Sequence, residues 1–159
     1  MTQLNRLIER LSGANIDFVI VGGFAGVLHG SSLVTRDLDV CIVLSVENVE
    51  RLRAVFRDLH PRHRLTAQKF SFLDNPEPDV ALNNLYLETD LGPVDFLGEI
   101  KGIGGFEHVR QISVEIDLFG KRCRVISIEG LIRAKEALGR EKDLLAAKEL
   151  RAILEKNKR

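Results

Sequence analysis

The segment Phe18–Val43, with the sequence FVIVGGFAGVLHGSSLVTRDLDVCIV, is the most informative part of the chain. Its first four residues are apolar and predict a buried strand, and Gly22 and Gly23 follow directly. Glycine lets backbone N–H groups approach a phosphate without a Cβ in the way, and a helix that opens there adds the positive end of its dipole. This half of the segment predicts a phosphate-binding turn, although glycine pairs also occur in turns for backbone reasons alone.

Two carboxylates, Asp37 and Asp39, stand one residue apart at the start of a second apolar run, residues 38–44. Side chains alternate along a strand, so these acids share one face while Leu38 and Val40 face the core. Two carboxylates on one strand face repel each other unless a cation lies between them. The second half of the segment therefore predicts a cation site.

A third acid, Asp95, lies on a predicted hairpin. Residues 85–89 alternate between apolar and polar, residues 90–92 form a turn, and residues 94–98 return as a strand. An isolated carboxylate on such a strand is costly unless it is exposed or bound to a positive group. Asp95 is therefore a candidate for the same cation site.

The spacing of these motifs resembles that of the nucleotidyltransferase superfamily related to DNA polymerase beta. In this sequence an apolar residue and two glycines precede thirteen residues and then an Asp-apolar-Asp-apolar run. The fuller string is most similar to the branch that contains the AbiEii-type toxin nucleotidyltransferases, and it consists of Gly22-Gly23-Phe24-Ala25, His29-Gly30 and Thr35-Arg36-Asp37-Leu38-Asp39. The resemblance is good over residues 1–45 and patchier beyond them.

The resemblance implies an α/β (α+β) fold with a mixed sheet flanked by helices and short C-terminal helices. It also implies that Asp37, Asp39 and Asp95 hold two Mg²⁺ or Mn²⁺ ions and act as the catalytic carboxylates. The implied reaction transfers a nucleoside monophosphate from an NTP to a hydroxyl, which requires positioning and charge neutralisation more than covalent chemistry.

The resemblance assigns further residues to nucleotide binding. Gly22 and Gly23 would contact the triphosphate. The loop residues Ser31, Ser32 and Thr35 could donate hydroxyl groups, but turn formation explains them equally well.

Many relatives carry an arginine at the position of Leu33. If that arginine binds phosphate, this protein uses Arg36 or Lys135 instead or binds phosphate more weakly. Lys135, Lys142 and Asp143 match a helical lysine followed by Arg-x-Lys-Asp, a group that the resemblance connects with nucleotide handling. An ordinary pair of amphipathic helices joined by salt bridges is an equal alternative.

The remaining pattern predicts the other elements. Ser45 and Ser127 are candidate N-caps, and Pro61 ends the helix that follows Ser45. The first predicted helix begins after a Thr2 cap and ends at Ser12. The further predicted helices cover residues 24–29, 45–59, 127–138 and 141–156. The further predicted strands cover residues 18–21, 70–73, 113–118 and 122–126, and residues 101–105 form a mobile loop.

Length and composition limit the possible classes. The 159 residues fit a single domain, residues 1–159, with a core at about 14–126 and a helical segment at about 127–157. A net charge of zero excludes a global basic field for nucleic acid. Cys41 and Cys123 have no metal-ligand spacing and are predicted to be buried and reduced. We expect a cytoplasmic protein without a membrane span.

Two functional classes follow. One is an enzyme that modifies a hydroxyl of RNA, a protein or a small molecule, with a toxin–antitoxin or phage-defence pair as a candidate setting. The other is a catalytically weak relative that binds nucleotide or a partner protein. We expect acceptor choice to lie with a partner such as an antitoxin, with a homodimer interface or with the short C-terminal helices.

Overall fold

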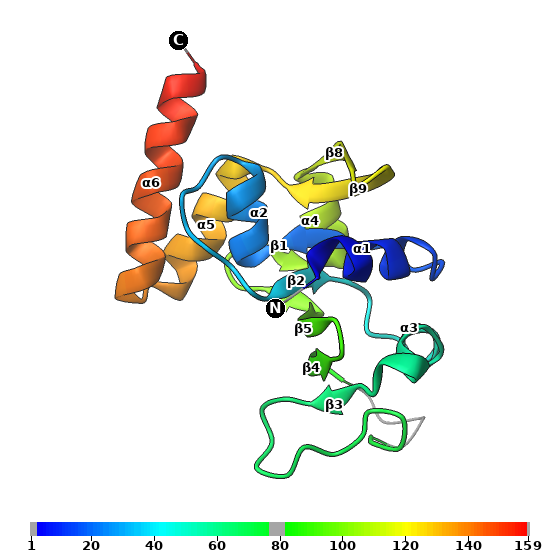
Figure 1. Cartoon of the computed structure of the whole chain (residues 1–159). Coiled ribbons are helices and arrows are strands. Elements are labelled where there is room, and N and C mark those ends of the chain that lie inside the picture. Colours follow the sequence, from blue (N-terminus) through cyan, green and yellow to red (C-terminus); the bar gives the residue numbers. More distant parts are fainter. Residues whose placement is uncertain (1–2, 77–81, 159) are drawn as a thin grey trace.

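The computed structural model describes residues 3–76 and 82–158, so the predicted Thr2 cap and the predicted loop residues Pro78, Asp79 and Val80 lie outside the described residues. Its centre is a seven-stranded mixed sheet in the order β3-β4-β5-β2-β1-β9-β8 (Figure 1). The strands are β1 (Val19–Val21), β2 (Leu38–Cys41), β3 (Arg62–His63), β4 (Asn84–Thr89), β5 (Gly92–Leu97), β8 (Ser113–Leu118) and β9 (Lys121–Ile126). This is the mixed sheet with flanking helices that the sequence predicts.

Strand pairing brings the two acidic strands together. β2 runs antiparallel to β1 and parallel to β5, and Asp39 lies directly opposite Asp95 in the β2–β5 pair. Leu38 and Val40 on the other face of β2 are fully buried. Phe96 on β5 packs there against Phe56, with ring centroids 6.0 Å apart. One face of these strands is therefore core, and the other carries the acids.

Six α-helices and one 3₁₀ helix surround the sheet in the described part of the chain. Their bounds are α1 (Leu4–Ser12), α2 (Gly22–Leu28), α3 (Val46–Phe56), η1 (Arg57–Leu59), α4 (Phe106–Gln111), α5 (Ile128–Leu138) and α6 (Glu141–Asn157). α2 packs on β1 and β2, and α5 contacts both α2 and α6. Figure 1 shows α6 running alongside α5 at one end of the molecule, far from β3.

The predicted helix caps at Ser45 and Ser127 are confirmed. The Ser45 hydroxyl accepts a hydrogen bond from the backbone N–H of Asn48, and that of Ser127 accepts one from Gly130, both at 3.1 Å. Gly139 ends α5 with φ +70°, a conformation that favours glycine. The strand–turn–strand prediction for residues 85–98 is confirmed as well, since β4 and β5 form that hairpin.

Two predictions about local structure were wrong. Residues 70–73 form no strand, and only Ser71 bridges to Arg62. The buried guanidinium of Arg53 binds the carbonyl oxygens of Phe72 and Pro76, which bends this segment around it. The predicted loop at 101–105 lies within a hairpin of β6 (Glu99–Ile100) and β7 (Gly104–Gly105), followed by the unpredicted helix α4.

The cysteines are buried and free, as predicted, and burial raises the pKa of the Cys41 thiol to about 11. Within the described residues, every helix is too short or too polar to cross a bilayer.

Candidate active site

Asp37, Asp39 and Asp95 line one cavity of about 550 Å³. Asp39 and Asp95 come from the directly opposed positions of β2 and β5, and Asp37 immediately precedes β2. The period-two argument for Asp37 and Asp39 is thus consistent with the structure, because both side chains reach the same cavity. The three acids, separated by up to 58 residues in sequence, are brought together by strand order.

Gly22, the first residue of α2, closes one side of this cavity. Its φ is +69°, and a Cβ at this position would lie 2.1 Å from Oδ2 of Asp39. Any side chain larger than hydrogen would therefore displace the carboxylate. Gly23 has a different neighbour, since its Cβ would lie 3.1 Å from the hydroxyl oxygen of Thr35.

The acids perturb one another electrostatically. Burial, followed by the charges of Asp95 and Asp37, raises the pKa of Asp39 to about 7. Burial also raises the pKa of Asp95, against the opposing effect of the neighbouring Arg64 guanidinium. Such mutual repulsion is relieved by a cation placed among the carboxylates.

Arg64 is that cation for Asp95 in this structure. Its Nη2 donates to both oxygens of Asp95, at 2.5 and 2.6 Å. The backbone N–H of Arg64 donates to the carbonyl of Tyr86, the residue opposite Asp95 in the β4–β5 pair. The ion pair therefore lines the cavity, and it is held there by a segment to which the sequence analysis assigned no functional role.

Five basic side chains line the cavity, and they are Arg64, Lys101, Lys135, Arg140 and Lys142. Two of them share one buried acid. Asp143, which is 1% exposed, accepts from Arg140 Nε at 2.6 Å and lies 3.8 Å from Lys135 Nζ. Arg140 chiefly lowers the pKa of this carboxyl. Lys135 and Arg140 therefore line the cavity and also join the two helices through their ion pairs with Asp143, which is not itself part of the lining.

Some predicted nucleotide-binding residues lie elsewhere. Ser31 and Ser32 both donate their hydroxyl groups to Glu149 on α6, at 2.6 Å each. Thr35 donates to the carbonyl oxygen of Asp37 at 3.2 Å, and Arg36 is exposed. Within the described residues, the cavity lining omits Gly23, Ser31, Ser32, Thr35, Arg36 and Asp143. The serines and Thr35 act in this structure as the anchors of a loop.

Sequence reasoning missed several lining residues. Tyr86 and Asn84 lie on β4, where the alternation with Leu85 and Leu87 already placed them on the non-core face. Glu99 continues the face of Asp95 four residues further along the chain, so it too could have been found. Arg64 gave no such signal, because the sequence around it shows neither the alternation of a strand nor the periodicity of a helix.

The donor set suits a hard divalent cation, since carboxylate oxygens are the ligands that Mg²⁺ prefers. Two opposed aspartates and a third on the same cavity wall supply those oxygens. No group of three acidic, histidine or cysteine side chains in residues 3–76 and 82–158 is already drawn together as a metal-binding cluster. The residues therefore fit a metal ion chemically, with Asp95 currently paired to Arg64.

No family model and no curated protein matches the sequence. Solved structures match its fold. A presumed nucleotidyltransferase from Thermotoga maritima superposes with a TM-score of 0.58 at 16% identity, covering 100% of this chain and 97% of that one. The lincosamide antibiotic adenylyltransferase LnuA, solved with lincomycin, gives 0.60 at 16% identity over 94% of this chain and 95% of its own.

A third structure, ANT(2″)-Ia in complex with adenylyl-2″-tobramycin, gives a TM-score of 0.51 at 17% identity. It aligns over 95% of this chain and 98% of its own. Together these likenesses show that the chain has the nucleotidyltransferase fold predicted from the sequence.

Proposed function

We propose that this protein is a metal-dependent nucleotidyltransferase that transfers a nucleoside monophosphate from an NTP to a hydroxyl group. The observation that carries the proposal is the opposition of Asp39 and Asp95 across β2 and β5, with Asp37 on the same cavity. The fold adds support, because the solved structures that share it include one named an adenylyltransferase and one in complex with an adenylylated tobramycin.

In this proposal Asp37, Asp39 and Asp95 hold two Mg²⁺ or Mn²⁺ ions. Bound divalent ions supply charge stabilisation for the transferring phosphoryl group and a lowered pKa for the acceptor hydroxyl. The raised pKa of Asp39 supports this role, since its proton compensates in part for a cation that the carboxylates require.

The basic side chains at the cavity neutralise the triphosphate. Lys135, Arg140 and Lys142 reach the cavity from the last turn of α5 and the start of α6. Asp143 fixes the first two through its ion pairs, which is a positioning role. Gly22 lets Asp39 lie at the start of α2, beside the place where the phosphates would bind.

We favour a small-molecule hydroxyl as the acceptor. LnuA was solved with lincomycin and ANT(2″)-Ia with an adenylylated tobramycin, and this chain spans 95% and 98% of their lengths. A net charge of zero also provides no general attraction for RNA. The toxin–antitoxin setting, an antitoxin or second copy as partner and a cytoplasmic location stay predictions from the sequence.

The alternative is a scaffold of the same fold that binds nucleotide weakly. The Arg64–Asp95 pair favours it, because both oxygens of the third carboxylate are occupied. Metal dependence distinguishes the two. An enzyme needs Mg²⁺ together with Asp37 and Asp39 to bind nucleotide, whereas a scaffold binds nucleotide equally well without Mg²⁺ and without these two carboxylates.

The test is transfer of label from each α-³²P-labelled NTP, with Mg²⁺ or Mn²⁺, into a cell extract separated into dialysable and macromolecular fractions. We expect a new labelled compound in the dialysable fraction, separated by chromatography from the NTP and its hydrolysis products, and we expect it to be lost with Asp37→Asn or Asp39→Asn. The control is Asp117→Asn, which removes an exposed carboxylate on β8. Label in RNA or protein would overturn the choice of acceptor, and metal-independent binding without transfer would support the scaffold.

A further inference from the structure

The contact between Arg64 and Asp95 is unusually complete for a residue expected to bind metal. One guanidinium nitrogen, Nη2, approaches both carboxylate oxygens to within 2.6 Å. Those oxygens are the atoms that a divalent cation would need. An arginine and a cation cannot occupy the same side of one carboxylate together, because their charges repel and their positions overlap.

Arg64 is not satisfied as a permanent structural arginine would be. Its Nε is buried and has no hydrogen-bond partner among the described residues. Arg53 provides the comparison within the same chain. Its Nε donates to Phe72 at 3.0 Å, its other nitrogens bind Glu50 and Pro76, and its guanidinium stacks on the Phe72 ring. A buried donor without a hydrogen-bond partner costs free energy, so the Arg64 side chain is held in its present position less strongly than the Arg53 side chain is.

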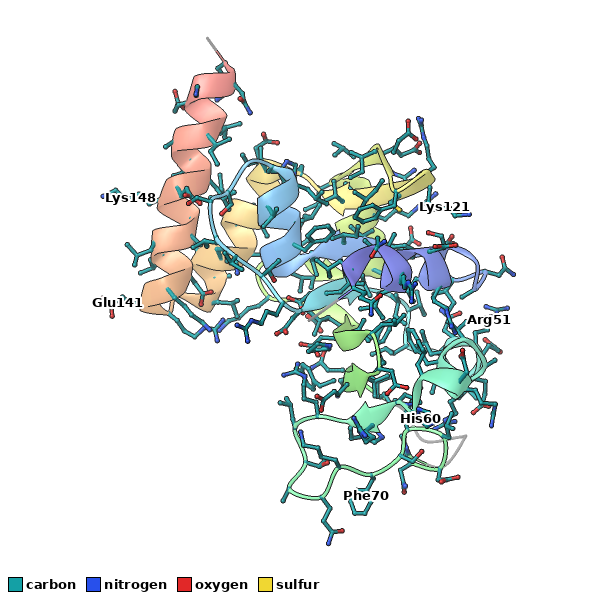
Figure 2. The ribbon with its side chains drawn as sticks, in the orientation of Figure 1. Arg51, His60, Phe70, Lys121, Glu141 and Lys148 are labelled. Carbon is teal, nitrogen blue, oxygen red and sulfur yellow. The ribbon has the colours of Figure 1, made fainter. Side chains whose placement is uncertain are left out.

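The backbone N–H of Arg64 is hydrogen-bonded to Tyr86, so only its side chain has to leave Asp95. The segment that follows, residues 65–70, is exposed throughout. It leaves the sheet after β3 and projects from the molecule, with Phe70 near its far end (Figure 2). Leu65 and Phe70 are exposed by 64% and 48%. Segments with few buried apolar contacts open at low free-energy cost.

Asp39 gives a divalent cation an advantage over the guanidinium. A cation between the opposed Asp39 and Asp95 would meet both carboxylates, whereas Arg64 hydrogen-bonds only to Asp95. We propose that Arg64 and a divalent cation compete for Asp95, so that Arg64 keeps the third carboxylate out of metal coordination until a cation displaces it. This inference rests on the proposed function, because it requires the cation site at Asp39 and Asp95.

The test measures Mn²⁺ binding by electron paramagnetic resonance to the full chain without nucleotide. Arg64→Ala is compared with wild type, and Arg64→Gln is a second variant that keeps most of the side-chain volume. Arg62→Ala is the matched control, since Arg62 is an exposed arginine two residues away that is not part of the cavity lining. Circular dichroism checks that each variant is folded.

We expect both Arg64 variants to bind Mn²⁺ about tenfold more tightly than wild type, the effect of removing one charge-assisted hydrogen bond from the competing state. Arg62→Ala should bind as wild type does. In an Asp95→Asn background the effect of Arg64→Ala should disappear, because the two residues then no longer interact.

Other outcomes separate the two proposals. If Arg64→Ala binds Mn²⁺ as wild type does while Asp39→Asn abolishes binding, the competition is overturned and the metal site stands. An effect of Arg64→Ala that persists with Asp95→Asn also overturns it, because it would reflect general charge alone. If no variant binds Mn²⁺ with or without ATP, the proposed function fails and this inference fails with it.

Discussion

The Cα of Gly22 lies against the carboxylate of Asp39 so closely that a methyl group on it would approach Oδ2 to 2.1 Å. Gly22, the first residue of α2, and Asp39 on β2 are thus in close contact, so the presence of the carboxylate excludes any side chain at residue 22. The glycine of the motif is explained here by the acid, as well as by the phosphate that the sequence pattern suggests.

Gly22→Ala should therefore destabilise the protein strongly and abolish transfer. The positive φ costs alanine about 1–2 kcal/mol, and displacing Asp39 adds about 1–3 kcal/mol more. Gly120→Ala is the matched control, since Gly120 has φ +77° and nothing within 4 Å of the position that a Cβ would take. Urea denaturation compares the two free energies of unfolding. Equal losses of unfolding free energy in the two variants would show that the Asp39 carboxylate can move aside at no cost.

Asp39→Asn should stabilise the metal-free protein by about 1–2 kcal/mol at pH 8 and leave it unchanged near pH 4. The folded protein keeps a proton on Asp39 up to a pKa of about 7, whereas the unfolded chain loses it near its ordinary value. The stability of the wild type therefore decreases as the pH rises from the pKa of the unfolded chain to that of the folded protein. The stability of Asp39→Asn does not decrease in this way, because asparagine has no proton to lose. Thermal unfolding against pH measures the difference, and Mg²⁺ should stabilise wild type alone at pH 8. A variant that is less stable than wild type at pH 8 would contradict the repulsion.

Asp143→Asn should lower stability by about 1–3 kcal/mol at pH 7, because it leaves Arg140 and Lys135 without their buried anion. The pKa of Asp143 is lower in the folded protein than in the unfolded chain. Its contribution to folding stability is therefore fully present when the pH is above the ordinary pKa of an aspartate, and it is lost as the pH falls through the pKa of the folded protein. The difference from wild type should thus shrink below about pH 4.

Nucleotide binding by calorimetry should also weaken in Asp143→Asn. Glu136→Gln is the control, because it removes an acid from an exposed pair with Arg151 on the same two helices. Equal nucleotide affinity in both variants would show that the buried pair serves only the fold.

Glu149→Ala should release the loop that precedes Asp37. Glu149 accepts hydrogen bonds from the hydroxyl groups of Ser31 and Ser32 and from the backbone N–H of Ser32. Hydrogen exchange should become faster at Ser32 and Leu33 in this variant and remain unchanged in Glu155→Ala, whose acid lies further along α6. Unchanged exchange in Glu149→Ala would mean that the loop is held by its own backbone.

The sequence predicted the parts of the site that depend on strand period. Asp37 and Asp39 followed from alternation along a strand, and Asp95 followed from an isolated carboxylate on a predicted hairpin strand together with the family resemblance. The serine caps and the hairpin turn indicated where the neighbouring elements begin. Tertiary context was needed only to bring β5 beside β2.

The rest depended on contacts between distant residues in segments without a period. Ser31 looked like a phosphate ligand because nothing local showed Glu149, which lies 118 residues away in sequence. Arg64 reaches Asp95 because Arg53 and Phe72 set the path of the segment around it, and no local pattern encodes that path. Long-range polar contacts of this kind are the part of a site that propensity cannot reveal.

The hairpin between β4 and β5 turns through only Asp90 and Leu91, and its register sets which side of the sheet Asp95 occupies. Losing or gaining one residue on β5 would exchange Asp95 with Val94 or Phe96, placing a charge among apolar side chains and an apolar side chain in the cavity beside Asp39. Insertions and deletions should therefore be tolerated far less within this short hairpin than in the projecting segment after β3, although neither the turn residue Asp90 nor Leu91 touches the cavity.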